Sequence, residues 1–83
     1  MIIKYFSWIK EHVGKSEEQI ELPDHINNVD ELINHLNELD KKYSLILEKK
    51  KLIKIAVNKT YSSFDASINN SDEIAFFPPV TGG

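Results

Sequence analysis

The chain has 83 residues, of which 41% are hydrophobic and 28% charged, with no cysteine and a net charge of −3. This length suits one domain with a small core, and the charged and apolar fractions argue against a disordered chain. The negative charge argues against nucleic acid as a partner, because phosphate binding needs a clustered basic surface. The lack of cysteine excludes disulfides, thiolate metal sites and a cysteine nucleophile.

The N-terminal segment, MIIKYFSWIKEHVG, is apolar in places but also carries charges. Lys4, Lys10 and Glu11 interrupt it, so it fits neither the apolar region of a signal peptide nor a membrane span. We therefore expect a cytoplasmic protein without a membrane partner, and the absence of cysteine is compatible with a reducing compartment.

Three short elements are predicted at the start of the chain. Residues 2–6 (IIKYF) are β-branched and aromatic with one charge, which is typical of a strand. A helical turn follows over residues 8–13 and ends at Gly14, because glycine readily takes the left-handed conformation of a helix C-cap. Residues 17–22 (EEQIEL) alternate between apolar and polar side chains, which predicts a second strand.

The clearest predicted element is a helix over residues 29–42. Its apolar residues recur at steps of three and four along one stripe, which consists of Val29, Leu32, Ile33, Leu36 and Leu39. Asn28 stands where an N-cap belongs, and Glu31 is placed to complete a capping box. Lys41 and Lys42 suit the negative end of the helix dipole.

The second half of the chain predicts three more strands. They cover residues 52–58 (LIKIAVN), 61–64 and 73–77. The order of elements predicts an α+β domain over residues 1–77, with one main helix across a mixed sheet of about five strands. Residues 78–83 then form an extended C-terminal tail.

The alternation along these strands predicts which side chains leave the core. The inward-facing residues are Ile3, Tyr5, Ile74 and Phe76, and in the segment 52–58 one face carries Ile53, Ile55 and Val57. The outward-facing residues are Lys4, Phe6, Ala75 and Phe77, and in the segment 52–58 the other face carries Lys54, Ala56 and Asn58. Phe6 and Phe77 are therefore predicted to be exposed aromatic residues. Two interpretations stay open, namely incidental exposure and a partner-binding patch beside the tail.

The last eight residues, FFPPVTGG, have an unusual composition for the end of a chain. Pro78 and Pro79 favour a stiff, extended path, and from there the segment reaches on the order of 20 Å. Gly82 and Gly83 have no Cβ, so they can enter a slot that is too narrow for other residues. The hydroxyl of Thr81 has no base near it in sequence. These features predict a donor whose reactive group is the terminal carboxylate, once it is activated, for instance as an acyl-adenylate.

Three segments carry a resemblance to a known family: AVNKT at residues 56–60, SFD at residues 63–65 and DEIAFFPPVTGG at residues 72–83. In these segments, and in pattern over its full length, the chain resembles the small subunit of molybdopterin synthase. These proteins are the MoaD-type ubiquitin-like sulfur carriers of the MoaD/ThiS family. The family often has a glycine in the turn before the third strand, where this chain has lysine at residues 49–51, so the type of that turn stays open.

The resemblance implies a β-grasp, or ubiquitin-like, fold and a role in molybdenum cofactor biosynthesis. It implies that Gly83 is adenylated with ATP by an E1-like activating enzyme and becomes a thiocarboxylate with sulfur from a donor protein. The tail then enters the large catalytic subunit, where the sulfur passes to cyclic pyranopterin monophosphate. The assembly implied is a heterotetramer of two large and two small subunits.

The resemblance also implies which residues form the site. The reacting carbonyl belongs to Gly83. The residues that enter the partner ahead of it are Pro78, Pro79, Val80, Thr81 and Gly82. The residues that contact the partner are Phe6, Lys10 and Phe77. We expect no catalysis by the isolated chain, no bound cofactor and no metal, since the three histidines, His12, His25 and His35, lack the spacing of metal ligands.

Other functions remain open from the sequence. A sulfur carrier for thiamine synthesis or tRNA thiolation would share the fold and the terminal diglycine. A covalent protein modifier would join Gly83 to lysines of other proteins. A pure docking domain would not need the two glycines at all. The lysine run at residues 49–51 is interpreted as a solvated loop, with a phosphate or nuclear-import patch as the alternative.

Overall fold

Residues 1–79 are described in the structure, which is a computed structural model, and they form five strands and three α-helices. The strands are β1 (Ile2–Tyr5), β2 (Glu17–Gln19), β3 (Lys54–Val57), β4 (Thr60–Ser62) and β5 (Glu73–Phe77). The helices are α1 (Ser7–Val13), α2 (Val29–Leu39) and α3 (Ser44–Glu48), with two 3₁₀ turns, η1 (Lys41–Tyr43) and η2 (Lys50–Leu52).

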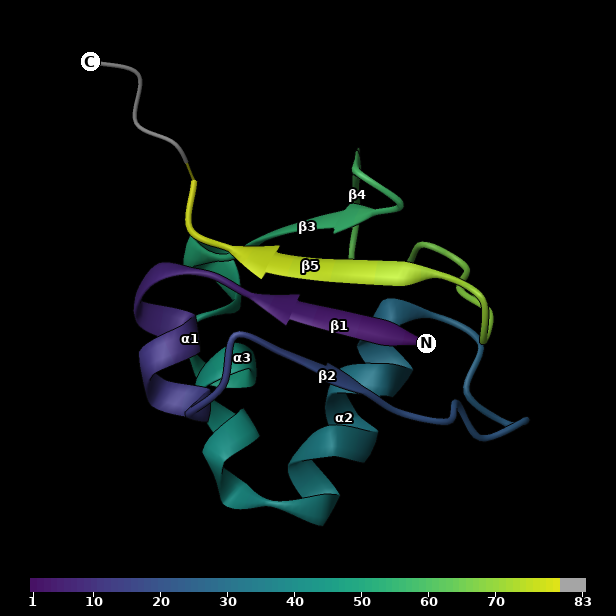
Figure 1. Cartoon of the computed structure of the whole chain (residues 1–83), viewed down its shortest axis with the longest axis horizontal. Helices are drawn as coiled ribbons and strands as arrows, with labels where there is room; N and C mark the ends of the chain where they lie inside the picture. Colours follow the sequence, from purple (N-terminus) through teal and green to yellow (C-terminus); the bar gives the residue numbers. More distant parts are fainter. Residues whose placement is uncertain (80–83) are drawn as a thin grey trace.

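The strands form one mixed sheet in the order β2-β1-β5-β3-β4. The central strand β5 runs parallel to β1 and antiparallel to β3, and the outer pairs β1–β2 and β3–β4 are antiparallel. Figure 1 shows the three helices together on one side of this sheet. The arrangement is a β-grasp, or ubiquitin-like, fold, so the predicted fold class is confirmed.

The first elements agree with the prediction except at their ends. β1 stops at Tyr5, one residue early, and α1 ends at Val13 as predicted. Gly14 takes a φ of 92°, and its N–H donates to the carbonyl of Lys10 at 2.8 Å. β2 is three residues shorter than predicted, because the chain beyond it leaves the ladder and the N–H of Leu22 donates to Asn70 Oδ1 at 2.9 Å instead.

The start of α2 is capped by side chains, as the sequence predicts, with one difference. Asn28 Oδ1 accepts a hydrogen bond from the N–H of Glu31 at 2.8 Å. The carboxylate of Glu31 reaches back to the N–H of Asn27 at 2.6 Å, one residue before the N-cap. Two backbone donors at the helix start are therefore satisfied, although the return bond of the capping box goes to a different residue.

The predicted end of this helix at residue 42 is wrong, because α2 ends at Leu39. Asp40 has an extended backbone, and its Oδ1 accepts a hydrogen bond from the N–H of Lys42 at 2.9 Å, which begins η1 instead. Leu39, predicted on the apolar stripe, is 68% exposed. The chain then forms α3, which the sequence analysis does not predict and which contributes the fully buried Ile46.

A single hydrophobic core lies between the sheet and the helices. The four residues predicted to face inward are all buried. Ile53 and Ile55 are buried too, and Val57 packs against the core while partly exposed. Helical residues complete this core, chiefly Ile9, Leu32, Ile33, Leu36 and Ile46. Within residues 1–79, no helix has the length and apolar character needed to cross a bilayer.

A carboxylate on the edge strand β2 joins two tyrosines. Glu18 accepts hydrogen bonds from the hydroxyls of Tyr5 at 2.6 Å and Tyr43 at 2.7 Å, and Lys15 Nζ lies 3.4 Å from its other oxygen. Burial tends to raise the pKa of Glu18, but the two tyrosine hydroxyls and Lys15 outweigh burial and hold it below the ordinary value of 4.5. Burial and the carboxylate raise the pKa of both tyrosines, which therefore stay protonated donors.

We expect Glu18→Gln to lower the free energy of unfolding near neutral pH by about 1–3 kcal/mol, because hydrogen bonds to a charged acceptor are lost. The folded pKa of Glu18 is depressed, so its contribution is present above pH 4.5 and is lost as the pH falls through the folded pKa. Urea unfolding across this range measures the effect, with Glu17→Gln, an exposed carboxylate on the same strand, as the control. A deficit that persists unchanged in acid would contradict this account.

Candidate docking site

The face of the sheet opposite the helices has two alanines at its centre, which we call the alanine floor. Cross-strand pairing places Lys4 beside Ala75, Ala75 beside Ala56, and Ala56 beside Tyr61, so these four residues form a row across β1, β5, β3 and β4. Residues directly opposite one another project from the same face. Because alanine side chains are short, the middle of the row is lower than its ends.

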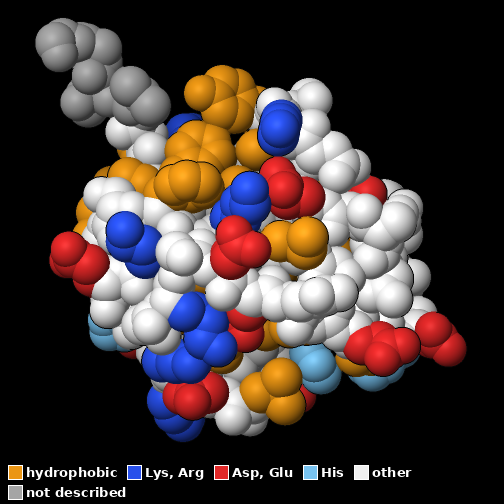
Figure 2. Space-filling model, viewed as in Figure 1, with side chains coloured by type: hydrophobic (Ala, Val, Ile, Leu, Met, Phe, Trp, Pro, Cys, Tyr) orange, Lys and Arg blue, Asp and Glu red, His pale blue; other side chains and the backbone are white. Residues whose placement is uncertain are grey.

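A second row lies toward the end of β5 and carries the two predicted phenylalanines. Phe77 is paired with Lys54 of β3. On the other side, the N–H of Phe6 donates to the carbonyl of Phe76 at 3.1 Å, which brings Phe6 to the same end of the sheet. Figure 2 shows hydrophobic side chains gathered in this region with lysine side chains among them.

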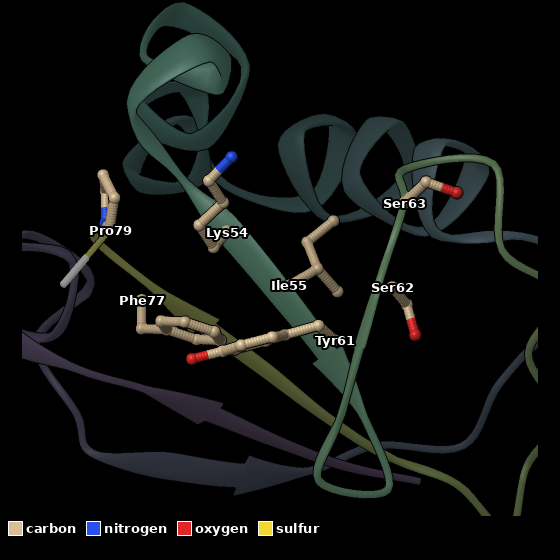
Figure 3. A pocket seen from close by; sticks show the side chains of 7 residues that line it. All are labelled: Lys54, Ile55, Tyr61, Ser62, Ser63, Phe77 and Pro79. Atoms are coloured by element: carbon tan, nitrogen blue, oxygen red, sulfur yellow. The ribbon is translucent and has the colours of Figure 1, made fainter.

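An aromatic pair separates two open hollows, the first on this face and the second at the β3–β4 edge of the sheet. The ring centroids of Tyr61 and Phe77 are 5.6 Å apart and their planes meet at 31°. The first hollow, of about 550 Å³, is lined on one side of the pair chiefly by Phe6, Ala56, Ala75 and Pro78. The second, of about 530 Å³, is lined on the other side chiefly by Lys54, Ser62, Ser63 and Pro79, as Figure 3 shows. We call this surface, with both hollows, the docking face.

The structure brings most of the described candidate residues together. Phe6 is 47% exposed, as predicted, whereas Phe77 is half-buried because the ring of Tyr61 lies against it. Pro78 and Pro79 each line one hollow, so the docking face surrounds the point where the chain leaves β5. Lys10 is exposed on α1 and lines neither hollow. The other candidates, Val80, Thr81, Gly82 and Gly83, lie outside the described residues.

Tyr61 belongs to the docking face but was not predicted. It is 76% exposed, the largest exposed fraction among the large apolar residues described. Its position follows from a two-residue turn at Asn58 and Lys59, both at positive φ (52° and 68°), which pairs Val57 with Thr60. A sequence that indicated this two-residue turn would also have assigned Tyr61 to the face of Ala56. The turn is not indicated, because lysine is an unusual residue at positive φ.

Two of the three histidines lie close together. The rings of His25 and His35 lie edge to face with centroids 6.4 Å apart. Among residues 1–79, no group of three or more histidine, aspartate or glutamate side chains is arranged to hold a metal ion.

The fold and this face define a ubiquitin-like β-grasp domain with an aromatic surface at the base of its C-terminal segment. The sequence matches the ThiS family over residues 3–83. The chain belongs to this family.

Two relatives are similar over nearly the whole chain. A protein of Haemophilus influenzae is 38% identical and covers 98% of this chain and 96% of its own length. A protein of Dictyostelium discoideum is 40% identical and covers 98% of this chain and 93% of its own length. Both are named molybdopterin synthase sulfur carrier subunit.

Solved structures share the fold. A Pyrococcus furiosus protein described as a putative molybdopterin converting factor, subunit 1, has a TM-score of 0.75 at 31% identity, with 95% of each chain covered. The small archaeal modifier protein 1 of Haloferax volcanii has a TM-score of 0.74 at 18% identity, with 96% of this chain and 97% of that chain covered. A complex of subunits 1 and 2 of the molybdopterin-converting factor of Helicobacter pylori matches with a TM-score of 0.62 at 22% identity, covering 99% and 96%. The latter two likenesses concern the fold.

The adjacent residues Phe76 and Phe77 offer a test of which ring belongs to the core. Phe76 has no exposed surface, so Phe76→Ala should cost about 3–5 kcal/mol in the free energy of unfolding. Phe77 is half-buried on the outer face, so Phe77→Ala should cost less than half as much. Denaturant unfolding of both variants measures the difference. Equal losses would place Phe77 in the core and remove it from the docking face.

Proposed function

We propose that this chain is the sulfur carrier subunit of a molybdopterin synthase and that Gly83 carries the sulfur as a C-terminal thiocarboxylate. The observation that carries the proposal is the near full-length match, at 38–40% identity, to relatives with that name. The family match extends to residue 83 and therefore includes the diglycine.

The proposed chemistry takes place at the carboxylate of Gly83 in two steps. The carboxylate first attacks the α-phosphorus of ATP on an E1-like activating enzyme, which releases pyrophosphate and leaves an acyl-adenylate. A sulfide equivalent from a sulfur donor protein then attacks the acyl carbon. The C–S bond forms, the C–O bond to AMP breaks, and one former carboxylate oxygen leaves on AMP. The product is a thiocarboxylate, a better nucleophile than the carboxylate from which it came.

In the proposed transfer, the large subunit supplies the active site and this chain supplies the sulfur. The C-terminal segment, residues 78–83, enters the large subunit, and the sulfur passes to cyclic pyranopterin monophosphate. The proposed assembly is a cytoplasmic heterotetramer with one carrier at each end of a pair of large subunits. The docking face is compatible with this division of labour, because its lining consists mainly of aromatic, aliphatic and cationic side chains suited to contact with a partner.

The docking face supports this proposal because it surrounds the base of the segment that has to be inserted. Phe6, Tyr61 and Phe77 provide large apolar contacts around Pro78, and interface centres are enriched in such aromatic residues. We propose that the large subunit packs against these three rings and that Lys10, exposed on α1, lies at the rim of that contact.

We expect Phe77→Ala to weaken binding to the large subunit by about 2 kcal/mol or more, because the variant loses a central aromatic anchor. Isothermal titration calorimetry with the purified large subunit measures the change. The matched control is Leu39→Ala, which truncates an exposed apolar side chain at the end of α2, away from the docking face. Equal affinities of the two variants would argue against the docking face as the contact.

The donor role of Gly83 is tested by adding one alanine after it. The reacting carbonyl is then displaced from the slot, so we expect no thiocarboxylate and no dithiolene product, with an unchanged melting temperature. Intact-mass measurement of chains produced with the activating enzyme reports the replacement of one oxygen by sulfur in the wild type. Sulfur transfer by the extended chain would refute the proposal.

Three further observations separate the alternatives. An isopeptide bond between Gly83 and lysines of other proteins, found by mass spectrometry without a thiocarboxylate, would identify a covalent modifier. Full activity after deletion of Gly82 and Gly83 would identify a docking domain. A thiocarboxylate that yields no dithiolene with the large subunit and precursor would assign the carrier to another thiolation pathway.

A further inference from the structure

The docking face is rimmed by lysines although the whole chain is negatively charged. Lys4 and Lys59 line the first hollow, and Lys54 lines the second. Among the described residues that line the two hollows, one is acidic: Glu73, in the first hollow. The chain has a net charge of −3, so its acidic residues lie mostly elsewhere and the docking face differs in sign from the molecule as a whole.

Two of these lysines have no acidic partner within residues 1–79. Lys4 is paired with Glu73, at 3.4 Å between Nζ and Oε1. Lys54 and Lys59 are exposed and take part in none of the ion pairs among the described residues. No carboxylate of residues 1–79 neutralises their charges, which can therefore act on a partner.

The backbone holds these two lysines at fixed positions around the aromatic pair. Lys54 is directly opposite Phe77 on the neighbouring strand, and Figure 3 shows it beside Phe77 and Pro79. Lys59 occupies the tip of the β3–β4 hairpin at a φ of 68°. Asn58, its neighbour, anchors that hairpin to β5, because its Oδ1 accepts from the N–H of Glu73 at 2.9 Å.

We propose that the docking face recognises protein surfaces in which an apolar centre is rimmed by aspartate and glutamate, and that Lys54 and Lys59 accelerate association with them. The inference rests on the proposed function, because it concerns the partner of the same face. Rim charges of opposite sign steer two proteins together and mainly change the association rate constant and its dependence on salt. The net charge of −3 and the small number of lysines on this face favour a protein partner over a nucleic acid, whose phosphates need a clustered basic surface.

The chain offers a control with the same change in net charge. The test variant is Lys54→Glu with Lys59→Asp, where aspartate is chosen because it tolerates positive φ. The control variant is Lys49→Glu with Lys51→Glu. These two lysines are also exposed, but they line a different hollow with Leu47, Leu52 and Phe64, away from the docking face.

The experiment is stopped-flow association of the full chain with the purified large subunit of its molybdopterin synthase, at several salt concentrations. At low salt we expect the test variant to associate about tenfold more slowly than the wild type or the control variant, with similar dissociation rates. The difference should vanish near 1 M salt, where the Debye length is about 3 Å.

Equal association rates for the test and control variants would overturn the inference while leaving the proposed function standing, because the large subunit would still bind. Release of the large subunit by a short oligonucleotide competitor would also overturn it, since the lysines would then serve a nucleic acid. Failure of the wild type to bind the large subunit at all would instead reject the proposed function, and the inference with it.

Discussion

The position of β5 between β1 and β3 is the constraint on which both the core and the docking face depend. Hydrogen bonding on both sides fixes its alternation, so Ile74 and Phe76 are fully buried while Phe77 projects from the opposite face. A slip of one residue would exchange the two faces. Each large side chain that lost its place in the core would cost about 1.5–3 kcal/mol. The core residues of this strand therefore also hold Phe77 and the start of the C-terminal segment in place.

The sequence predicts the fold well where the signal is local. Alternation in residues 73–77 predicts β5 with its observed bounds, and Asn28 predicts the start of α2, because each depends on neighbours in sequence. The end of α2 is not predicted, since Asp40 competes through a side-chain hydrogen bond that a periodic pattern does not report. The helix α3 is missed because the run of three apolar residues at 45–47 is too short to distinguish helix from strand.

Some residues of the candidate site can also be predicted from local sequence, and others cannot. Alternation alone assigns Phe6 and Phe77 to the outer face, because each lies in or next to a strand with a clear inner side. Tyr61 cannot be assigned like this, since its face depends on how β4 pairs with β3, and that pairing is set by the turn at Asn58 and Lys59. The lining of the two hollows combines residues of β1 and β5 with residues of the β3–β4 hairpin, so no single segment of the sequence contains their pattern.

The shape of the docking face bears on how a carrier of the proposed kind works. Such a protein has to bind an activating enzyme, leave it with its sulfur and then bind an acceptor, so no complex on the route can be permanent. Large, uniformly apolar interfaces favour permanent assembly. Here a few aromatic rings stand over an alanine floor within a charged rim. In an interface of this kind the charged rim raises the association rate constant, and the small number of aromatic contacts limits the lifetime of the complex. Under the proposed function, binding of the folded face places the C-terminal glycines in the partner without requiring the glycines to supply the affinity.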